Sequence, residues 1–389
     1  MRKVLRYYLR RTKRTRPSLE VDFGLNVFGF FSSALGLGEA ARSTVRGAQA
    51  VGLQVGIYDI PLKRHASSGE DDLALCQLGP FPVNLFHFNP DVIKLLMQNR
   101  IDQYYLAAKY NIGFWFWETQ RIPDHWVEAS ALFDEIWVGS SFCFEAVAQT
   151  VNRPVIRIPV NVGTIFCEEP LGRESLGLPP TGYIFLTMMD SQSTFERKNP
   201  FGVLEAFEMA FGTNPKDVML VVKIINAEAS RDYVRLKSIA HQNTGVILMD
   251  KVLSRHELNS LIKNVNCLVS LHRAEGFGLP IAEAMSMGKP VIATGWSANM
   301  DYMNHENSFL VPFGLEPLVS YETHYAKGTL WADPDVAYAS KIMRRLFENP
   351  GVGEEIGRIA RADIARNFNP SATGTAIRDR LRCIYQTIE

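Results

Sequence analysis

The stretch from residue 265 to residue 294 constrains the fold more than any other part of the chain. Residues 265–271 form an apolar, β-rich run that predicts a buried parallel strand. A glycine-rich loop follows, and Pro280 suits the first turn of a helix that should end at Gly288. Residues 291–294 predict a second strand. Strand, glycine-rich loop, helix and strand in this order are typical of a parallel α/β sheet.

The loop and its two glutamates predict a class of ligand. Free backbone N–H groups at a helix N-terminus favour an anion, and glycines let the backbone approach it closely. Glu275 and Glu283 would repel a phosphate, so we expect them to accept hydrogen bonds from hydroxyl groups. A phosphate at the helix end and carboxylates on hydroxyls together describe a sugar nucleotide. The candidate donor-binding residues in this loop and helix are Gly276, Phe277, Gly278, Leu279 and Glu283.

Two cations precede another predicted helix, residues 201–211. Arg197 and Lys198 lie where a diphosphate would be neutralised as it departs. Lys223, in the predicted strand 218–225, is a further candidate for binding the donor.

In the setting EGFGLPIAEAMSMGKPVIAT, Glu275 and Glu283 resemble the signature of retaining family-4 glycosyltransferases. The resemblance covers most of residues 20–389 and is strongest from residue 180 onward. It implies the α/β fold called GT-B, in which two doubly wound, Rossmann-like domains face each other across a cleft.

The resemblance also implies roles for particular residues. Glu275 would lie by the donor sugar, Glu283 would bind the ribose hydroxyls, and Lys198 matches the family's lysine. The backbone of Val252 and Leu253 would receive the base. Gln192 stands where the family often has a second arginine, so Arg197 would take over that role. A second glycine-rich turn, with Gly36 and Gly38, would face the donor diphosphate across the cleft.

The acceptor side is less determined. Glu118 follows the predicted strand 110–117, at a place where many family members have a histidine. Glu118 could bind a sugar hydroxyl or act as the base on the acceptor. His87, at the end of the predicted strand 83–88, is the alternative base, although a histidine there more often has a structural role. We expect the aromatic run 114–117 to lie mainly in the core, with one or two rings available to stack on a sugar.

The expected domains are a basic leader (1–17), an N-terminal acceptor-side domain (18–165), a linker (166–181) and a C-terminal sugar-nucleotide-binding domain (182–370). The C-terminal helix, about 371–389, should cross back to the first domain. The last strand is expected at 309–311, and Trp331–Pro334 should cap a helix that runs to about Asn349.

Charge is spread unevenly along the chain. Residues 1–16 hold eight positive charges and no acid, which leaves 33 positive against 41 negative charges in the remainder. This leader could form an amphipathic helix on an anionic membrane or a solvated tail. No recognised nucleic-acid module follows it. The five cysteines form no CxxC pair, and they fit reduced core residues in a cytosolic protein.

The resulting prediction is a retaining hexosyltransferase that uses a nucleotide sugar, with UDP-hexose favoured and GDP-mannose next. The acceptor is expected to be a saccharide or lipid-linked saccharide in polysaccharide synthesis. Arg197, Lys198 and a helix dipole can take the place of a metal, so we expect neither metal nor cofactor. The location is expected to be cytoplasmic, at most peripheral on the inner membrane face. A sugar-nucleotide epimerase and a non-catalytic sugar-nucleotide sensor are the alternatives.

Overall fold

The computed structural model describes residues 23–60, 81–93, 109–163, 169–227, 230–318 and 328–388, together with residues 62 and 325. Contacts divide the chain into unit 1, comprising Met1–Asn161 and Phe368–Glu389, and unit 2, comprising Val162–Asn367. The basic leader and two of the five cysteines, Cys76 and Cys167, lie outside the described residues.

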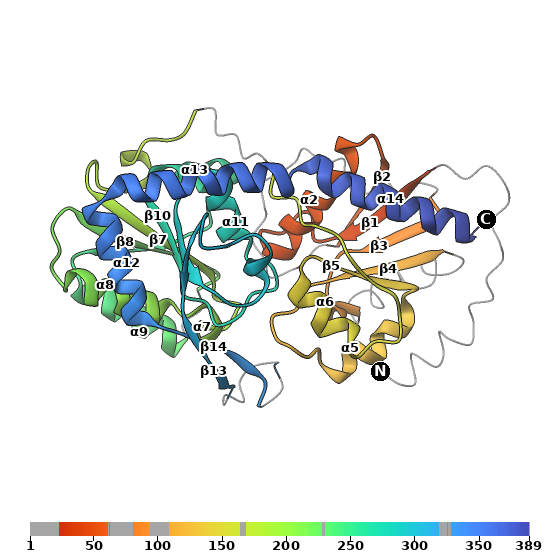
Figure 1. Ribbon diagram of the computed structural model, residues 1–389, viewed down its shortest axis with the longest axis horizontal. Coiled ribbons are helices and arrows are strands. Elements are labelled where there is room, and N and C mark those ends of the chain that lie inside the picture. The colour runs from red at the N-terminus through yellow and green to blue at the C-terminus, as the bar shows by residue number, and fades with distance from the viewer. Residues whose placement is uncertain are drawn as a thin grey trace. The chain divides into compact units, whose positions relative to one another are not determined.

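Unit 1 is built on a six-stranded parallel sheet (Figure 1). Its strands are β1 (Gly24–Gly29), β2 (Gln54–Asp59), β3 (Val83–Phe86), β4 (Tyr110–Trp115), β5 (Glu135–Val138) and β6 (Val155–Arg157). Their order in the sheet is β2-β1-β3-β4-β5-β6. All residues of β1, β3 and β5 are buried, because helices cover a parallel sheet on both faces.

Within its described residues, unit 1 contains the helices α2 (Gly36–Ala50), α5 (Asp124–Ala129), α6 (Ser141–Ala148) and α14 (Pro370–Ile388), with 3₁₀ turns η1 (Pro90–Val92) and η2 (Ser130–Leu132). Helix α14 packs against α2. The two helices come so close that a Cβ added to Gly374 would lie 2.0 Å from the backbone oxygen of Gly47. Glycine at both positions therefore sets the distance between these helices.

Two side chains of α14 bind the sheet of unit 1. Arg380 is ion-paired with Glu135 of β5, whose side chain is fully buried. The hydroxyl of Tyr385 donates to the carbonyl of Gly24 at 2.7 Å and accepts from the Gly24 N–H at 3.0 Å. The last helix of the chain is thus an integral part of unit 1.

Unit 2 contains a second six-stranded parallel sheet, of order β12-β11-β10-β7-β8-β9. Its strands are β7 (Tyr183–Asp190), β8 (Val218–Ile225), β9 (Val246–Asp250), β10 (Cys267–Ser270), β11 (Val291–Thr294) and β12 (Phe309–Val311). Starting from its first strand, this is the order 3-2-1-4-5-6 of a dinucleotide-binding sheet. The α/β fold with two doubly wound sheets is confirmed.

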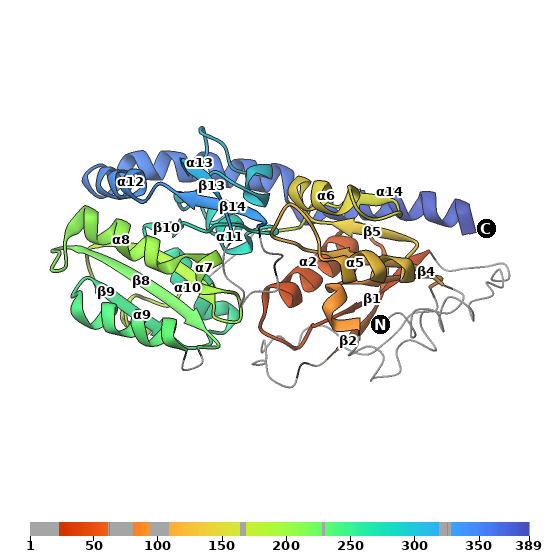
Figure 2. The same cartoon turned by 90° about the horizontal axis from the view of Figure 1, so that it is seen from below.

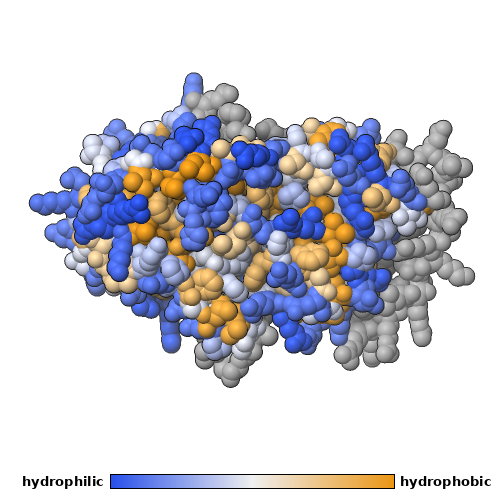
Figure 3. All heavy atoms as spheres, viewed as in Figure 1, coloured by the Kyte–Doolittle hydropathy of each residue, from blue (hydrophilic) through white to orange (hydrophobic). Residues whose placement is uncertain are grey.

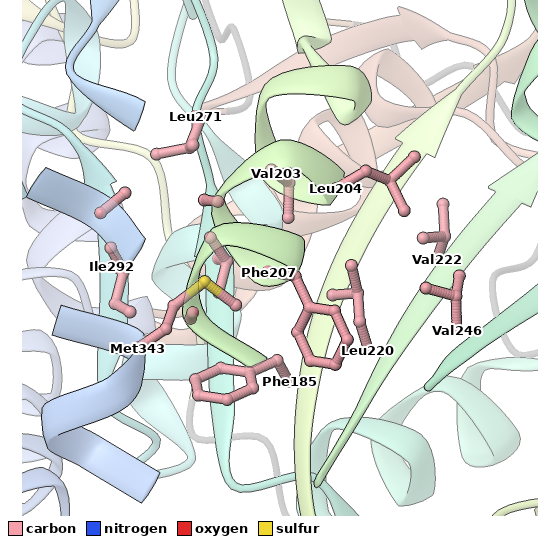
Figure 4. Close-up of a cluster of buried hydrophobic side chains, with 14 of the residues drawn as sticks. Phe185, Val203, Leu204, Phe207, Leu220, Val222, Val246, Leu271, Ile292 and Met343 are labelled. Carbon is pink, nitrogen blue, oxygen red and sulfur yellow. The ribbon is translucent and has the colours of Figure 1, made fainter. Parts of the chain in front are cut away.

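The helices of unit 2 are α7 (Phe195–Lys198), α8 (Pro200–Phe211), α9 (Arg231–Gln242), α10 (Arg255–Asn264), α11 (Leu279–Ser286), α12 (Val336–Glu348) and α13 (Pro350–Asn367), with 3₁₀ turns η3 (Glu174–Leu176) and η4 (Ala298–Asp301). Figure 2 shows helices on either side of the strands of this unit. Figure 4 shows Phe207 of α8 and Met343 of α12 beside Phe185, Leu220 and Ile292 of the sheet. All five side chains are completely buried, so α8 and α12 pack on one face of the sheet.

Three sequence predictions about elements in this part of the chain are wrong. Strand β12 is not the last, because β13 (Phe313–Pro317) and β14 (Leu330–Pro334) follow as an antiparallel pair. The residues expected to cap the next helix, Trp331–Pro334, lie in β14, and Asp335 caps α12 by accepting from the N–H of Tyr338 at 2.8 Å. Cys383 is exposed on α14 and is not a core residue.

The segment expected to be a linker packs within unit 2 over its described residues, 169–181. The N–H of Leu171 donates to Ser260 at 3.0 Å, and Arg173 donates to the backbone oxygens of Asn264 and Gly182. These bonds tie the segment to α10, which explains why it does not behave as a free connection.

The surface mixes polarities on the face drawn in Figure 3, where hydrophobic residues form patches between hydrophilic ones. Of the helices in the described ranges, none is long and apolar enough to cross a membrane.

Candidate functional site

The loop after β10 is shaped by Gly278, which caps α11 in the left-handed conformation with φ of 84°. The hydroxyl of Tyr302 donates to the carbonyl of Phe277 at 2.7 Å, and a Cβ on Gly278 would lie 2.8 Å from that hydroxyl. A side chain at residue 278 is therefore disfavoured for two reasons: the backbone has a positive φ, and the Tyr302 hydroxyl occupies the space of a Cβ. Pro280 lies in the first turn, as the sequence predicts, and the helix begins one residue earlier than expected, at Leu279.

Glu275 is a buried carboxylate between two cations. Its side chain is ion-paired with Lys198, and Nη1 of Arg197 lies 3.4 Å from its Oε2. Burial alone would raise the pKa of Glu275, but the charges of Lys198 and Arg197 outweigh burial and lower it to about 2. Glu275 is therefore ionised at neutral pH and can only accept hydrogen bonds.

The two cations reach Glu275 because α7 is bonded to the loop after β10. Thr194 caps α7, and the N–H of Arg273 donates to the carbonyl of Arg197 at 2.7 Å. Nη1 of Arg197 also donates to the carbonyl of Ala274 at 2.9 Å. Arg197 is 5% exposed and binds the loop from its buried side, whereas the Lys198 side chain is 16% exposed. Lys198 is thus the cation better placed to meet a ligand.

A second loop supports Glu275 from β11. The N–H of Glu275 donates to the hydroxyl of Ser297 at 2.9 Å, and the N–H of Ala298 donates to the carbonyl of Glu275 at 3.3 Å. Ser297 has φ of 75° and ψ of −148°, a backbone conformation that costs a non-glycine residue of order 1–3 kcal/mol. This strain persists because the surrounding hydrogen bonds over-determine the loop.

His272 joins the same two loops. It is fully buried, and burial lowers its pKa, so the ring is neutral. Its Nε2 lies 3.1 Å from Oδ1 of Asn299 and 3.3 Å from the carbonyl of Trp296, and both atoms are acceptors. Nε2 therefore carries the proton, and Nδ1 accepts from Ser270 at 3.0 Å. The hydrogen bonds of His272 therefore fix the loop that carries Glu275 to the loop after β11.

Glu283, on α11, is buried and bonded to a residue that the sequence analysis missed. Nη1 of Arg255, the first residue of α10, lies 2.8 Å from Oε1 of Glu283. Arg255 stands directly after Ser254, which caps α10, and nothing in the sequence links it to a residue 28 positions later.

Lys223 lies near the carboxyl end of β8, in register with Met188 of β7 and Met249 of β9. It is 7% exposed, and burial lowers its pKa to about 8, against the opposing effect of Asp190 and Asp250. Of the two residues predicted to receive the base, Val252 is 45% exposed and Leu253 is half-buried, in the loop that follows β9.

The candidate residues of unit 1 lie at the start of α2 and in the loop after β4. Gly36 and Gly38 were expected in a turn before a helix, but they lie in the first turn of α2 itself. A Cβ on Gly38 would lie 2.5 Å and 2.7 Å from two backbone oxygens, whereas one on Gly36 would meet open space. Arg42 of α2 fixes this turn by donating to the carbonyl of Phe31 at 2.7 Å. Glu118 is half-buried in the loop after β4.

His87 is poorly suited to act as a base. Its side chain is fully buried, and burial lowers its pKa to about 3. The hydroxyl of Thr44 donates to the carbonyl of Ala40 at 3.0 Å and so accepts from Nε2 of His87, 3.1 Å away. His87 thus joins β3 to α2, which favours the structural interpretation. The aromatic run 114–117 is also buried throughout.

Comparison with protein families gives a match for most of unit 2. Residues 173–363 match the family described as Glycosyl transferases group 1. No curated protein matches the chain by sequence.

Solved structures show the fold of the whole chain. Sucrose-phosphate synthase from Thermosynechococcus elongatus is similar with a TM-score of 0.66 at 14% identity, over 94% of this chain and 100% of that one. HepE from Anabaena, in complex with UDP and glucose, gives 0.65 at 14% identity, over 93% and 100%. A glycosyltransferase from Rickettsia africae gives 0.65 at 14% identity, over 95% and 99%. The fold is GT-B, as the resemblance implied.

Unit 2, the domain in which the matched residues lie, contains most of the predicted site. It brings Lys198 and Glu275 together from 77 residues apart, with Arg197 beside them, and it places Glu283 on the helix that follows. Gly36, Gly38 and Glu118 belong to unit 1, outside the matched residues. Among the described residues, no group of three or more His, Cys, Asp or Glu side chains is arranged to hold a metal ion.

The part of the site within this domain offers three kinds of chemistry at one edge of the sheet. An ionised carboxylate accepts hydrogen bonds, a lysine supplies positive charge, and the N-terminus of α11 presents backbone N–H groups.

Proposed function

We propose that the protein is a retaining glycosyltransferase of the family-4 type, which moves a hexose from a nucleotide sugar to a saccharide acceptor in polysaccharide synthesis. The observation that carries the proposal is the Lys198–Glu275 ion pair at the carboxyl edge of a dinucleotide-binding sheet, inside the domain that matches the glycosyl transferases group 1 family. Ligands of open α/β sheets bind at this edge.

The favoured donor is a UDP-hexose, with GDP-mannose next. HepE, which shares the fold, is described in complexes with UDP, with UDP and glucose, and with UDP-glucose. We assign the base to the backbone of Val252 and Leu253, with Lys223 nearby, and the ribose hydroxyls to Glu283.

At the reacting end of the donor, ionised Glu275 would accept hydrogen bonds from the sugar hydroxyls. Lys198 and Arg197 would stabilise the negative charge that develops on the departing diphosphate. Gly276, Phe277, Gly278 and Leu279, at the start of α11, would approach the phosphates through their backbone, and Gly36 and Gly38 of unit 1 would do the same from their own turn. These cations supply the charge that a metal would otherwise provide, so we propose transfer without a metal or a cofactor.

Retention would follow from attack on the face that the leaving group vacates. The acceptor oxygen forms a bond to the anomeric carbon, the bond from that carbon to the phosphate oxygen breaks, and the departing phosphate takes the acceptor proton. Glu118 is our candidate for orienting the acceptor hydroxyl. The acceptor would be a saccharide or lipid-linked saccharide, and the basic leader, residues 1–16, would bind an anionic membrane surface.

The test is a thermal-shift panel with UDP, GDP, ADP and their hexose conjugates, with and without EDTA. Binding at a hundred times the dissociation constant adds about 2.7 kcal/mol of stability. We expect a shift with one nucleotide family that EDTA does not change. Failure of every nucleotide at millimolar concentration would refute the donor site.

Turnover is tested by product analysis. Glu275→Ala should reduce transfer far more than it weakens nucleotide binding, because the carboxylate is assigned to the sugar. Glu355→Ala, at an exposed glutamate of α13, is the matched control. Conversion of the donor alone into an isomer would identify an epimerase, and binding without turnover would identify a sensor.

A further inference from the structure

The two glutamates of the motif share a feature that the motif itself does not contain. Each is buried, and each is ion-paired with a cation from a different element: Glu275 with Lys198 of α7, and Glu283 with Arg255 of α10. A buried carboxylate without a partner carries a large desolvation cost, so a paired cation fixes both its charge and its direction.

The Arg255–Glu283 pair is held rigidly from both ends. Helix α10 begins with a capping box, in which Ser254 accepts from the N–H of Glu257 at 3.2 Å and Glu257 accepts from the N–H of Ser254 at 2.8 Å. Gly278 caps helix α11, and the hydroxyl of Tyr302 lies 3.0 Å from its carbonyl oxygen. Both backbones are therefore fixed before the side chains meet.

The pair also joins two parts of the site that are far apart in sequence. Arg255 lies two residues after Leu253, and Leu253 belongs to the segment assigned to the base. Glu283 is assigned to the ribose. In a nucleoside the base and the ribose are covalently linked. A bond between α10 and α11 thus sets the distance between the two groups that must bind one nucleoside.

A carboxylate can accept from more than one donor. Arg255 donates to Oε1 of Glu283, and the two oxygens of an ionised carboxylate offer about four acceptor positions in all. The Arg255 side chain is 27% exposed and that of Glu283 is 8% exposed, so the guanidinium shields the carboxylate on one side. Hydroxyl groups of a bound ribose would be further donors to the same carboxylate.

We propose that Arg255 is a positioning residue that fixes Glu283 for recognition of the ribose hydroxyls, so that the site selects ribonucleotide donors over deoxyribonucleotide donors. This inference rests on the proposed function, because it requires a nucleotide in the site. It assigns to Arg255 an effect on one part of the ligand, the ribose, and none on the phosphates.

The experiment measures the dissociation constants of UDP, 2′-deoxy-UDP and 3′-deoxy-UDP by calorimetry, or of the corresponding GDP set if GDP is the nucleotide that binds. The proteins are the full-length wild type, Arg255→Ala, Arg255→Lys and Glu283→Gln. Arg358→Ala is the matched control, since Arg358 of α13 is exposed and ion-paired with Glu355 of the same helix. Thermal melting of each variant verifies that it folds.

We expect the wild type to bind the ribonucleotide about tenfold more tightly than at least one deoxy form, as one good charged hydrogen bond allows. Arg255→Ala and Glu283→Gln should each reduce this ratio to about two or less. Arg255→Lys should retain most of the preference, because a cation remains beside the carboxylate, and Arg358→Ala should retain all of it.

The outcomes separate the two ideas. If the wild type binds no nucleotide, the proposed function fails and the inference fails with it. If the wild type binds but Arg255→Ala keeps the full ribose preference, the inference is overturned while the proposed function stands. Equal weakening of all three ligands in Arg255→Ala would likewise overturn it, since a phosphate contact or a general loss of structure acts on every ligand alike.

Discussion

Removal of Lys198 should expose how strongly the site depends on its central ion pair. The pKa of Glu275 falls from 4.5 to about 2 in the folded protein, which corresponds to about 3 kcal/mol of stability at neutral pH. Because the folded pKa is the lower one, this stability is present above about pH 4.5 and is lost as the pH falls toward 2. Lys198→Met leaves the 8% exposed carboxylate with only Arg197, 3.4 Å away. We expect a loss of about 3 kcal/mol, typical of a broken buried pair.

A double-mutant cycle isolates this interaction. Lys198→Met, Glu275→Gln and the double variant are unfolded in urea at pH 7, and hydrogen exchange is read on peptides covering β10 and α11. Glu275→Gln removes the charge that Lys198 compensates, so the double variant should be less destabilised than the sum of the two single variants, by about 2 kcal/mol. Additive losses within about 0.5 kcal/mol would refute the view that Lys198 stabilises the ionised carboxylate.

Three further predictions concern unit 1. Arg380→Ala should lower its stability by about 3–5 kcal/mol in urea unfolding, because Glu135 is fully buried, and preserved stability would contradict the role given to this ion pair. Gly38→Ala should lower the melting temperature clearly and Gly36→Ala should not, since only the first Cβ meets backbone atoms, at 2.5 and 2.7 Å; equal melting temperatures would argue against this packing. Because burial lowers the pKa of His87 to about 3, stability should fall as the pH drops from about 6.5 toward 3. His87→Gln should reduce that slope by about 1.4 kcal/mol per pH unit, and an unchanged slope would show that His87 does not titrate in this way.

The sequence was most informative where local rules and tertiary structure agree. Buried parallel strands are continuous apolar runs, and the start of α11 needs both a glycine in the left-handed conformation and a proline in the first turn. Both signals are local, so the arrangement around Glu275 could be predicted. The β13–β14 pair could not, because residues 330–334 carry the composition of a helix cap and form a strand only through pairing with residues 313–317.

For the candidate site too, some features could be predicted from the sequence and others depend on the tertiary structure. By itself, the sequence was enough to predict which side chains carry the chemistry, namely Glu275, Glu283 and Lys198, since their residue types and spacing are legible along the chain. Only the tertiary structure decided what each carboxylate is paired with, because Arg255 and Glu283 come from separate helices. It also decided that His87 is neutral and unsuited to be a base, since burial by neighbouring strands and helices, rather than any residue beside it in sequence, sets its pKa.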